Sequence, residues 1–471
     1  MTNDKLNKRF RFGFWVIMLV AGLSLTSCLK DDDDDTIYYD DAAVTSFSLG
    51  TLNRYMHKKA SSGLDSVYVQ KVSCSNIKFF IDQQQGLIYN VDSLPYGLDL
   101  TKAVCTIVSK NSGVLMLNKG KEGRDSLVFY AADDSIDVSQ PMEVRVANMK
   151  GTAYRSYQLT VNMHQEDGDE FRWAEAMDEQ AMAALPAQPQ RLLCVGDKVF
   201  GFGQKTDGAV CMMPLNPFVA NDCVEFEPSA LDNAVSNGST MYVLEKESGK
   251  LYSWNAEDGK WNQLSMAETN VERLVGASTK EIYALSSEGG LLVSTDNGNT
   301  WQTENLDSDA NLLPSANISC TVHALRTNDG MERVMLIGTC EGRSTAMAWM
   351  KIVDLATPGA GTWMLVTATE DDLWALPQQD ALSVIGYGDV DVAYGMAADG
   401  TQSVMQSMDG GVTWKGDNDY TWPITLEAQP TSKLAVAVDG SNFIWMIPGD
   451  GSLWRGRLNK MGWKDVQMVF Q

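Results

Sequence analysis

Histidine and grouped cysteine are scarce in this sequence. Three histidines occur among 471 residues, at His57, His164 and His323, and they lie far apart. The eight cysteines include no C-x-x-C pair and no cluster with histidine. Zinc, haem and thiol-redox sites need such groupings, so we expect no metal and no redox cofactor.

Positive charge is also in short supply. Lysine and arginine number 37 against 61 aspartate and glutamate residues, which gives a net charge of -24. A phosphate backbone requires a basic surface, so nucleic acid is excluded as a partner. The glycine-rich segment 201–206 lacks the spacing of a nucleotide-binding P-loop, and neither G-x-S-x-G nor H-E-x-x-H occurs. We therefore expect no nucleotide and no cofactor.

Long apolar runs are limited to one, Phe12 to Leu25, which follows four basic residues. It is shorter than the ~20 residues of a membrane-spanning helix and has the flanks of a secretory signal. The run ends in Leu-Thr-Ser-Cys, which resembles a bacterial lipobox. That resemblance implies cleavage after residue 27 and lipidation of the Cys28 thiol. A retained anchor helix with an incidental cysteine is the alternative.

An acidic stretch, Asp31 to Asp35, follows Cys28-Leu-Lys. The order resembles the lipoprotein export signal of Bacteroidota, which implies a lipid-anchored protein on the outer face of the outer membrane. The simpler alternative is a solvated spacer extended by its own repulsion. We assign 1–27 to the signal peptide and 28–41 to an acidic tether.

Residues 42–163 contain short runs that are apolar or alternate between apolar and polar residues. Asn, Gly, Asp and Ser separate these runs, and none shows a sustained helical period. Eight or nine strands of this kind predict an immunoglobulin-like β-sandwich, which we expect to act as a spacer. The acidic segment 164–190 reads as a linker. Of the seven cysteines beyond Cys28, most are expected to be small core residues, and Cys74 with Cys105 is the pair to test for a disulfide.

A short pattern recurs before residue 137. Asp followed by Ser or Thr and then an aliphatic residue resembles the O-glycosylation acceptor of Bacteroides, which implies sugars on this part of the chain. The triplets begin at Asp35, Asp65, Asp92, Asp125 and Asp134.

One motif occurs twice in the remaining 281 residues, at 294–301 and 407–414. Both copies match S-x-D-x-G-x-T-W, the Asp-box of BNR-type β-propellers. The aspartate can accept hydrogen bonds from turn amides, and the glycine allows a backbone conformation unfavourable to other residues. The tryptophan opens the next strand and can wedge between blades. We predict a structural role for Ser294, Asp296, Gly298, Thr300, Trp301, Ser407, Asp409, Gly411, Thr413 and Trp414.

Degenerate copies end at Trp261, Trp363 and Trp463. The five tryptophans are about 40 to 60 residues apart, near the length of a four-stranded propeller blade. The sequence therefore predicts an all-β chain whose residues 191–471 form a β-propeller of about six blades. The predicted blades are 191–230, 231–270, 271–308, 317–368, 381–424 and 432–471. A seventh is possible if 171–177 and the long fourth unit hide further strands.

The whole layout resembles a known group of proteins. A lipobox with CLKDDDDD, a sandwich carrying TSFSLG (45–50) and GTAYRSYQLTVN (151–162), and an Asp-box propeller are together similar to the Bacteroidota lipoproteins of the DUF6242 family. This resemblance covers essentially the mature chain and implies its architecture. It brings no established activity.

The function we favour is binding of a carbohydrate or a surface protein through the top face of the propeller. Two long connections, 367–380 and 415–423, place aromatic and acidic residues on that face. Aromatic rings stack on sugars and carboxylates accept sugar hydroxyls. The alternative is that the aromatics fold inward between blades. The candidate ligand-binding residues are Trp374, Tyr420, Trp422, Asp371, Asp372, Asp417 and Asp419.

Two other functions stay open. A sialidase-like or other glycoside hydrolase would share the Asp-boxes, but sialidases need an R-I-P motif, an arginine cluster and a Tyr/Glu pair. The R-I-P motif is missing, and most of the seven propeller arginines lie beside turn signals. No catalytic residue can be selected. The third possibility is a structural accessory subunit of an outer-membrane complex.

Overall fold

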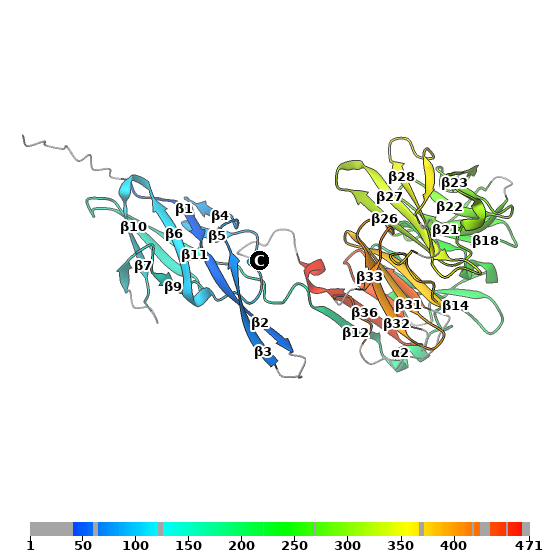
Figure 1. The fold of residues 1–471 in the computed structure, drawn as a ribbon, viewed down its shortest axis with the longest axis horizontal. Coiled ribbons are helices and arrows are strands. Elements are labelled where there is room, and N and C mark those ends of the chain that lie inside the picture. The colour runs from blue at the N-terminus through cyan, green and yellow to red at the C-terminus, as the bar shows by residue number, and fades with distance from the viewer. Residues whose placement is uncertain are drawn as a thin grey trace, which may run out of the picture. The chain divides into compact units, whose positions relative to one another are not determined.

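The structure is a computed structural model, and it describes 41–59, 65–120, 126–219, 221–266, 270–366, 372–416, 419–423, 434–448 and 451–463. The described residues up to Gln165 form one compact unit, and those from Glu166 form a second (Figure 1). Cys28, residues 29–40 of the acidic tether, Asp371 and Asp417 lie outside the described residues. In the described ranges, no helix has the length and apolar character needed to cross a membrane.

The first unit is a two-layer β-sandwich with an added hairpin. Its layers are a three-stranded sheet of order β1-β6-β9 and a six-stranded sheet of order β4-β5-β11-β10-β7-β8, and β2 pairs with β3. An immunoglobulin-like topology for this unit stays a prediction. The strands are β1 Val44–Leu49, β2 Thr51–Lys59, β3 Asp65–Ser73, β4 Phe79–Asp82, β5 Leu87–Asn90, β6 Ala103–Ser109, β7 Val114–Asn118, β8 Leu127–Phe129, β9 Ser135–Ile136, β10 Met142–Ala147 and β11 Tyr154–Thr160. Short 3-10 turns cover Leu100–Lys102 and Lys110–Ser112.

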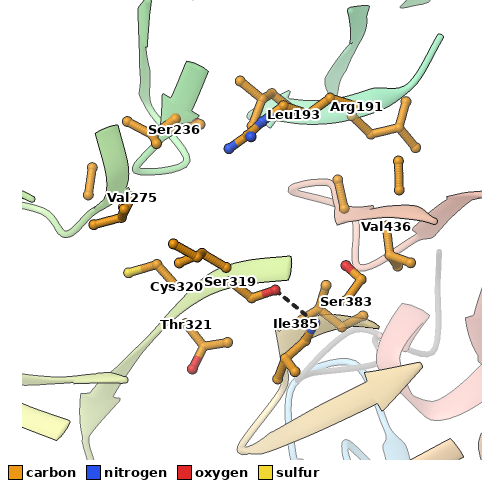
Figure 2. Close-up of a pocket in the computed structure, with 18 of the residues that line it drawn as sticks. Arg191, Leu193, Ser236, Val275, Ser319, Cys320, Thr321, Ser383, Ile385 and Val436 are labelled. Atoms are coloured by element: carbon orange, nitrogen blue, oxygen red, sulfur yellow. Dashed lines mark hydrogen bonds between the residues drawn. The ribbon is translucent and has the colours of Figure 1, made fainter. Parts of the chain in front are cut away.

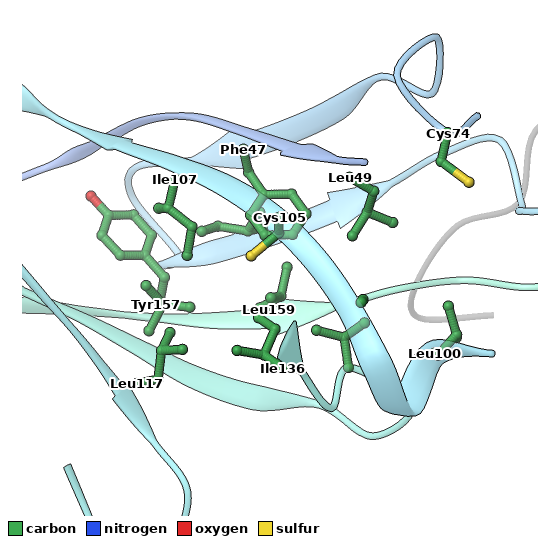
Figure 3. Packing of buried hydrophobic residues seen from close by; sticks show 14 of the residues in the cluster. Phe47, Leu49, Cys74, Leu100, Cys105, Ile107, Leu117, Ile136, Tyr157 and Leu159 are labelled. Atoms are coloured by element: carbon green, nitrogen blue, oxygen red, sulfur yellow. The ribbon is translucent and has the colours of Figure 1, made fainter. Parts of the chain in front are cut away.

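Side chains from both sheets fill the space between the layers (Figure 3). Strand β6 shows the pattern, since Ala103, Cys105 and Ile107 are buried and the residues between them are exposed. This period of two is what a strand with one face in the core requires. Leu117 and Leu159 face them from the other sheet.

Cys74 and Cys105, the pair to test for a disulfide, are not bonded to each other. Both cysteines are free and buried, and Figure 3 shows their sulfur atoms apart within the core. Burial raises the pKa of the Cys105 thiol to about 11. Both thiols therefore pack as small apolar groups.

The second unit consists of six sheets of four or five strands in its described part, with an inner strand in each. With the inner strand given first, the first two sheets are β13 Arg191–Val195, β14 Lys198–Gln204, β15 Val210–Asn216 and β16 Val224–Phe226, and then β17 Ala234–Ser236, β18 Thr240–Glu245, β19 Lys250–Asn255 and β20 Trp261–Leu264. The third and fourth are β21 Val271–Ala277, β22 Ile282–Ser286, β23 Leu291–Ser294 and β24 Gln302–Thr303, and then β26 Ala316–Leu325, β27 Asn328–Thr339, β28 Met347–Asp354, β29 Thr362–Leu365 and β25 Asn305–Leu306. The fifth and sixth are β30 Ala381–Tyr387, β31 Val390–Met396, β32 Gln402–Ser407 and β33 Lys415–Gly416, and then β34 Ala435–Val438, β35 Ile444–Ile447, β36 Leu453–Leu458 and β12 Phe171–Met177.

The inner strands close into a ring. Each of β13, β17, β21, β26, β30 and β34 contacts the inner strand of the sheet before it and of the sheet after it, and β34 contacts β13. This radial closure is the architecture of a β-propeller, which protects the edges of its sheets.

Strand β12 joins this ring from the far end of the chain. It pairs antiparallel with β36, from Phe171 opposite Leu458 to Met177 opposite Leu453. The prediction of a linker over 164–190 is therefore wrong, because 171–177 supplies the outer strand of the last sheet. The helix α2, Glu179–Ala183, follows, and the Asp178 side chain caps it by accepting a hydrogen bond from the Ala181 amide.

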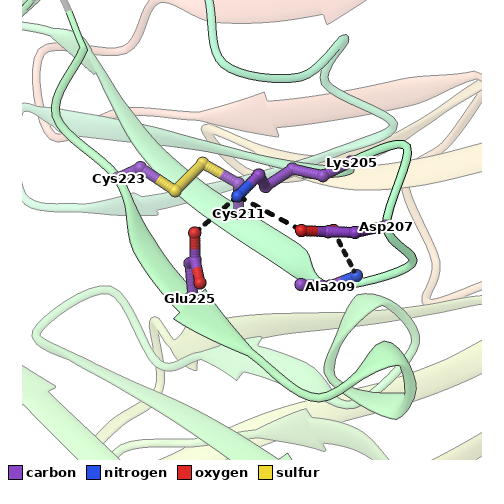
Figure 4. The surroundings of a disulfide bond; sticks show 6 residues. All are labelled: Lys205, Asp207, Ala209, Cys211, Cys223 and Glu225. Atoms are coloured by element: carbon purple, nitrogen blue, oxygen red, sulfur yellow. Dashed lines mark hydrogen bonds and ion pairs between the residues drawn. A yellow bond between two sulfur atoms is a disulfide. The ribbon is translucent and has the colours of Figure 1, made fainter.

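A disulfide appears where a free core cysteine was expected. Cys211 on β15 is bonded to Cys223, with their Cα atoms 5.6 Å apart (Figure 4). The Lys205 ammonium lies nearby, between the carboxylates of Glu225 and Asp207. The apolar neighbours of Cys211 indicated its burial, but not its partner twelve residues later.

Candidate functional site

The first Asp-box lies in the hairpin between β23 and β24. One Asp296 oxygen accepts hydrogen bonds from the Thr300 amide at 2.8 Å and from the Ser294 hydroxyl at 2.9 Å, and the other accepts from the Thr300 hydroxyl at 2.7 Å. Partial burial alone would raise the pKa of Asp296, but the hydrogen bonds from Thr300 and Ser294 bring it below its usual value. Gly298 has φ of +87°, and a Cβ there would meet Leu251 at 2.2 Å. The motif residues are thus accounted for by turn geometry.

The second Asp-box, between β32 and β33, repeats these contacts. Asp409 accepts from the Thr413 amide at 2.9 Å and from the Thr413 hydroxyl at 2.7 Å, and its pKa is lowered in the same way. The two tryptophans differ in burial. Trp414 is 2 % exposed and packs with Met335 and other buried residues, whereas Trp301 is half-buried.

The predicted aromatic platform is not assembled. Tyr420 is 8 % exposed, and its ring lies 6.1 Å from that of Phe171 and 5.8 Å from that of Tyr387, both edge-on. Trp422 packs edge-on against Tyr394 at 5.7 Å and donates a hydrogen bond to the Ser403 carbonyl. Both side chains therefore fold into the protein, as the alternative interpretation held.

Trp374, by contrast, is 55 % exposed. Its carbonyl accepts a hydrogen bond from the Trp414 amide at 2.8 Å, and the Lys415 ammonium lies 5.7 Å from the centre of its ring. Asp372 caps its own turn by accepting from the Trp374 amide. Asp419 is exposed. Of the five candidate residues that the structure describes, Tyr420 and Trp422 pack against other aromatic side chains, so they form no exposed platform with Trp374.

The cavity at the centre of the propeller is a better candidate. It measures about 680 Å³, and all six inner strands contribute to its wall. An inner strand has no ladder partner on its central side, so those backbone groups of this edge that have no partner within the protein are available to whatever fills the channel. Figure 2 shows residues from each of these strands around the cavity.

Most polar side chains of the channel wall are neutral. Ser319 accepts a hydrogen bond from the Val384 amide at 3.0 Å, and Thr321 donates to Asp391 at 2.6 Å. The Ser383 hydroxyl has no partner among the described residues. Cys320 also lines the wall, where burial raises the pKa of its thiol to about 12 and leaves it a weak nucleophile. Asp232 is the one carboxylate among the described lining residues.

Two arginines provide the positive charge of the channel. Arg191 on β13 and Arg273 on β21 both line it. Burial, and then the charge of Arg273, lower the pKa of Arg191 to about 10, while Asp232 opposes this. Arg191 therefore stays protonated at neutral pH. The described residues contain no cluster of three or more His, Cys, Asp or Glu side chains fit to hold a metal ion.

Sequence reasoning counted both arginines but gave them no role. Their positions near the start of two inner strands are visible only once the repeat boundaries are known. An arginine near the start of the first and third inner strands is the signal that could have identified the channel.

Comparisons with known proteins agree with this architecture. The family model described as DUF6242 beta propeller domain matches residues 167–466, and the DUF6242 N-terminal domain model matches 47–161. No curated protein matches the chain. Similar solved structures include a protein of unknown function from Bacteroides thetaiotaomicron (9% identity, TM-score 0.42, 81% of this chain and 98% of that one). Another is the SapL1 lectin in complex with alpha methyl fucoside (11%, 0.35, 57% and 91%). A third is YCF48 from Cyanidioschyzon merolae (13%, 0.31, 60% and 98%).

Proposed function

The chain belongs to the DUF6242 family, and from this premise we propose that it is a cell-surface lipoprotein that binds carbohydrate in the channel of its propeller. The lipobox at Cys28 and the acidic stretch after it support attachment to the outer membrane, facing the exterior. Recognition, rather than hydrolysis, is the activity.

The cavity enclosed by the six inner strands carries this proposal. A volume of about 680 Å³ lies within the range of small-molecule sites. Its wall offers hydroxyl groups and strand-edge amides, which suit the many hydroxyls of a sugar. A glycosidase normally places two carboxylates across the scissile bond, and the described lining offers Asp232 alone.

A plug in the channel tests the proposal. The full-length lipoprotein in detergent is applied to a glycan array beside the variant Ser383→Trp, which fills part of the cavity. Ser287→Trp is the matched control, because Ser287 is exposed and does not line the channel. We expect glycan binding to be lost in Ser383→Trp and kept in Ser287→Trp, with both variants folded by circular dichroism.

Three results would contradict the proposal. Equal binding by both variants would place the ligand outside the channel. Capture of outer-membrane proteins from the cell surface without any bound glycan would point to the accessory-subunit alternative. Release of new reducing ends from a bound glycan would indicate a hydrolase.

Lipidation of Cys28 and exposure of the propeller on the cell surface are tested separately. We expect intact-mass analysis of the membrane fraction to find a chain that begins at Cys28 and carries acyl groups. Surface labelling or protease treatment of intact cells should reach the propeller. An unacylated Cys28 would remove the proposed anchor.

A further inference from the structure

We propose that the channel contains an anion site at Arg191 and Arg273, and that its ligand is an acidic sugar whose carboxylate binds there. This inference rests on the proposed carbohydrate-binding function and adds the chemical class of the ligand. It depends on the charges of the channel wall rather than on the channel alone.

Among the described residues, the Arg191 guanidinium forms no ion pair, and the only carboxylate whose charge acts on it is that of Asp232. The guanidinium lines the cavity, and the described residues offer it no hydrogen bond. A cation removed from bulk water without a partner costs free energy, and proteins normally pair such groups. The five N–H donors of a guanidinium match a carboxylate bidentately.

Arg273 is only partly satisfied. One of its nitrogens lies 3.9 Å from Asp232, whose side chain is 74 % exposed, and another donates to the Ser315 carbonyl at 3.3 Å. Its Nε is buried without a hydrogen-bond partner. The charge of Arg273 also acts on Arg191, because its repulsion contributes to the lowered pKa of that residue. An anion bound by both guanidiniums would relieve this repulsion and use their free donors.

The rest of the wall suits the remainder of a sugar acid. Ser319, Thr321 and Ser383 come from inner strands other than those of the two arginines. A ligand that reaches from the guanidiniums to these hydroxyls needs one negative group and several hydroxyl groups. Acidic sugars carry both, whereas a neutral sugar would leave the Arg191 guanidinium without an anionic partner.

The net negative charge of the chain confines the attraction for an acidic ligand to the channel. At -24 the protein repels an acidic ligand at long range, and the two arginines act only within the channel. Moderate salt should therefore speed association, because it screens the long-range repulsion more than the enclosed contact.

Acidic glycans and their methyl esters provide matched probes, because esterification removes the charge and keeps the sugar. The panel contains oligogalacturonate, oligoglucuronate, their methyl esters and neutral glycans. Titration calorimetry is run with the full-length chain in detergent and with Arg191→Met. The control is Arg326→Met, since Arg326 is exposed and pairs with Asp389 outside the channel lining.

We expect an acid to bind at least tenfold more tightly than its ester. Arg191→Met should weaken binding of the acid by about 10- to 100-fold, the usual loss for a charge-assisted hydrogen bond, and leave the ester unchanged. Arg191→Lys should restore part of the affinity, and Arg326→Met should change nothing.

Failure of this inference can be told from failure of the proposed function. If neutral glycans and esters bind in the channel as tightly as acids, and Arg191→Met has no effect, the anion site is wrong and the channel function stands. If no glycan binds, both are wrong. Preferential binding of a peptide with a free C-terminal carboxylate would overturn the ligand class.

Discussion

Two cations of the propeller, Lys351 and Arg191, differ in whether the protein supplies partners for their charge. Lys351 on β28 is fully buried, and its ammonium lies 2.8 Å from Glu281 and 2.5 Å from Glu304. The ring of Tyr283 lies 5.7 Å away and its hydroxyl donates to Glu281. Arg191 lines the open channel and has no such partner among the described residues.

The difference follows from where each charge lies. Lys351 sits between the sheet of β21 to β24 and the sheet of β25 to β29, where no ligand can enter and the charge must be balanced within the protein. Arg191 faces a cavity that solvent and small molecules can fill. We infer that the inter-sheet cation contributes to structure and that the channel cation contributes to binding.

Replacement of Lys351 should have the largest effect. Lys351→Met leaves Glu281 and Glu304 buried without their cation, and we expect the free energy of unfolding to fall by about 3–5 kcal/mol. Urea denaturation followed by tryptophan fluorescence measures this. Lys250→Met, at an exposed position on β19, is the control. A loss no greater than that of the control would show that the cluster does not stabilise the propeller.

Glu304→Gln should have a smaller effect that depends on pH. Burial raises the pKa of Glu304 although Lys351 opposes this, so the folded state holds this proton more tightly than the unfolded chain. Stability linked to Glu304 is therefore greatest below the unfolded pKa of about 4.3 and declines as pH rises through the folded value. Glutamine still accepts a hydrogen bond from Lys351 but lacks the carboxyl group. We therefore expect Glu304→Gln to lower the free energy of unfolding by only about 1–2 kcal/mol at low pH, and this difference from wild type to shrink towards pH 7.

Thermal unfolding of both proteins from pH 4 to 8 tests this sign. The difference between wild type and Glu304→Gln should narrow with rising pH. A difference that widens instead would mean that ionised Glu304 is the favoured form in the folded protein.

The Asp-box carboxylates are charged groups whose hydrogen-bond donors lie within the same turn, so they add a third case to the comparison of Lys351 with Arg191. Asp296→Ala and Asp409→Ala should each lower the free energy of unfolding by about 1 kcal/mol, since each removes turn hydrogen bonds near the surface. Both carboxyls have a lowered pKa. Their contribution is therefore present above the unfolded pKa of about 3.9 and disappears as pH falls through the folded values. Equal acid sensitivity in wild type and both variants would contradict this assignment.

These Asp-box turns were the most predictable part of the molecule. Asp296 and Thr300 meet within five residues, so the motif alone specifies their contacts. The repeat of tryptophans likewise predicted a propeller, because a blade is a local unit of about 40 to 60 residues. The alternation of β6 predicted its buried face for the same reason.

Contacts between distant segments were less predictable. Tyr420 and Trp422 were expected on the surface because they lie in the long connection 415–423. In the structure Tyr420 packs against Phe171, and the Trp173 indole donates to the Thr421 carbonyl at 2.9 Å. About 250 residues separate these partners. The sequence of β28 also shows a lysine within an apolar run, but its partners Glu281 and Glu304 lie in two distant connections, between β21 and β22 and between β24 and β25.

Arg191→Met should change stability least, and this makes it the sharpest test of the comparison. Removing a cation that balances a buried charge lowers the free energy of unfolding, whereas removing a cation that has no partner in the unliganded protein does not. We expect the free energy of unfolding without ligand to stay within about 0.5 kcal/mol of wild type, or to rise, because the repulsion with Arg273 is gone. Thermal unfolding beside Lys351→Met gives the contrast directly. If both variants lose similar stability, Arg191 is a structural residue whose partner lies in the protein, and the distinction between the two cations fails.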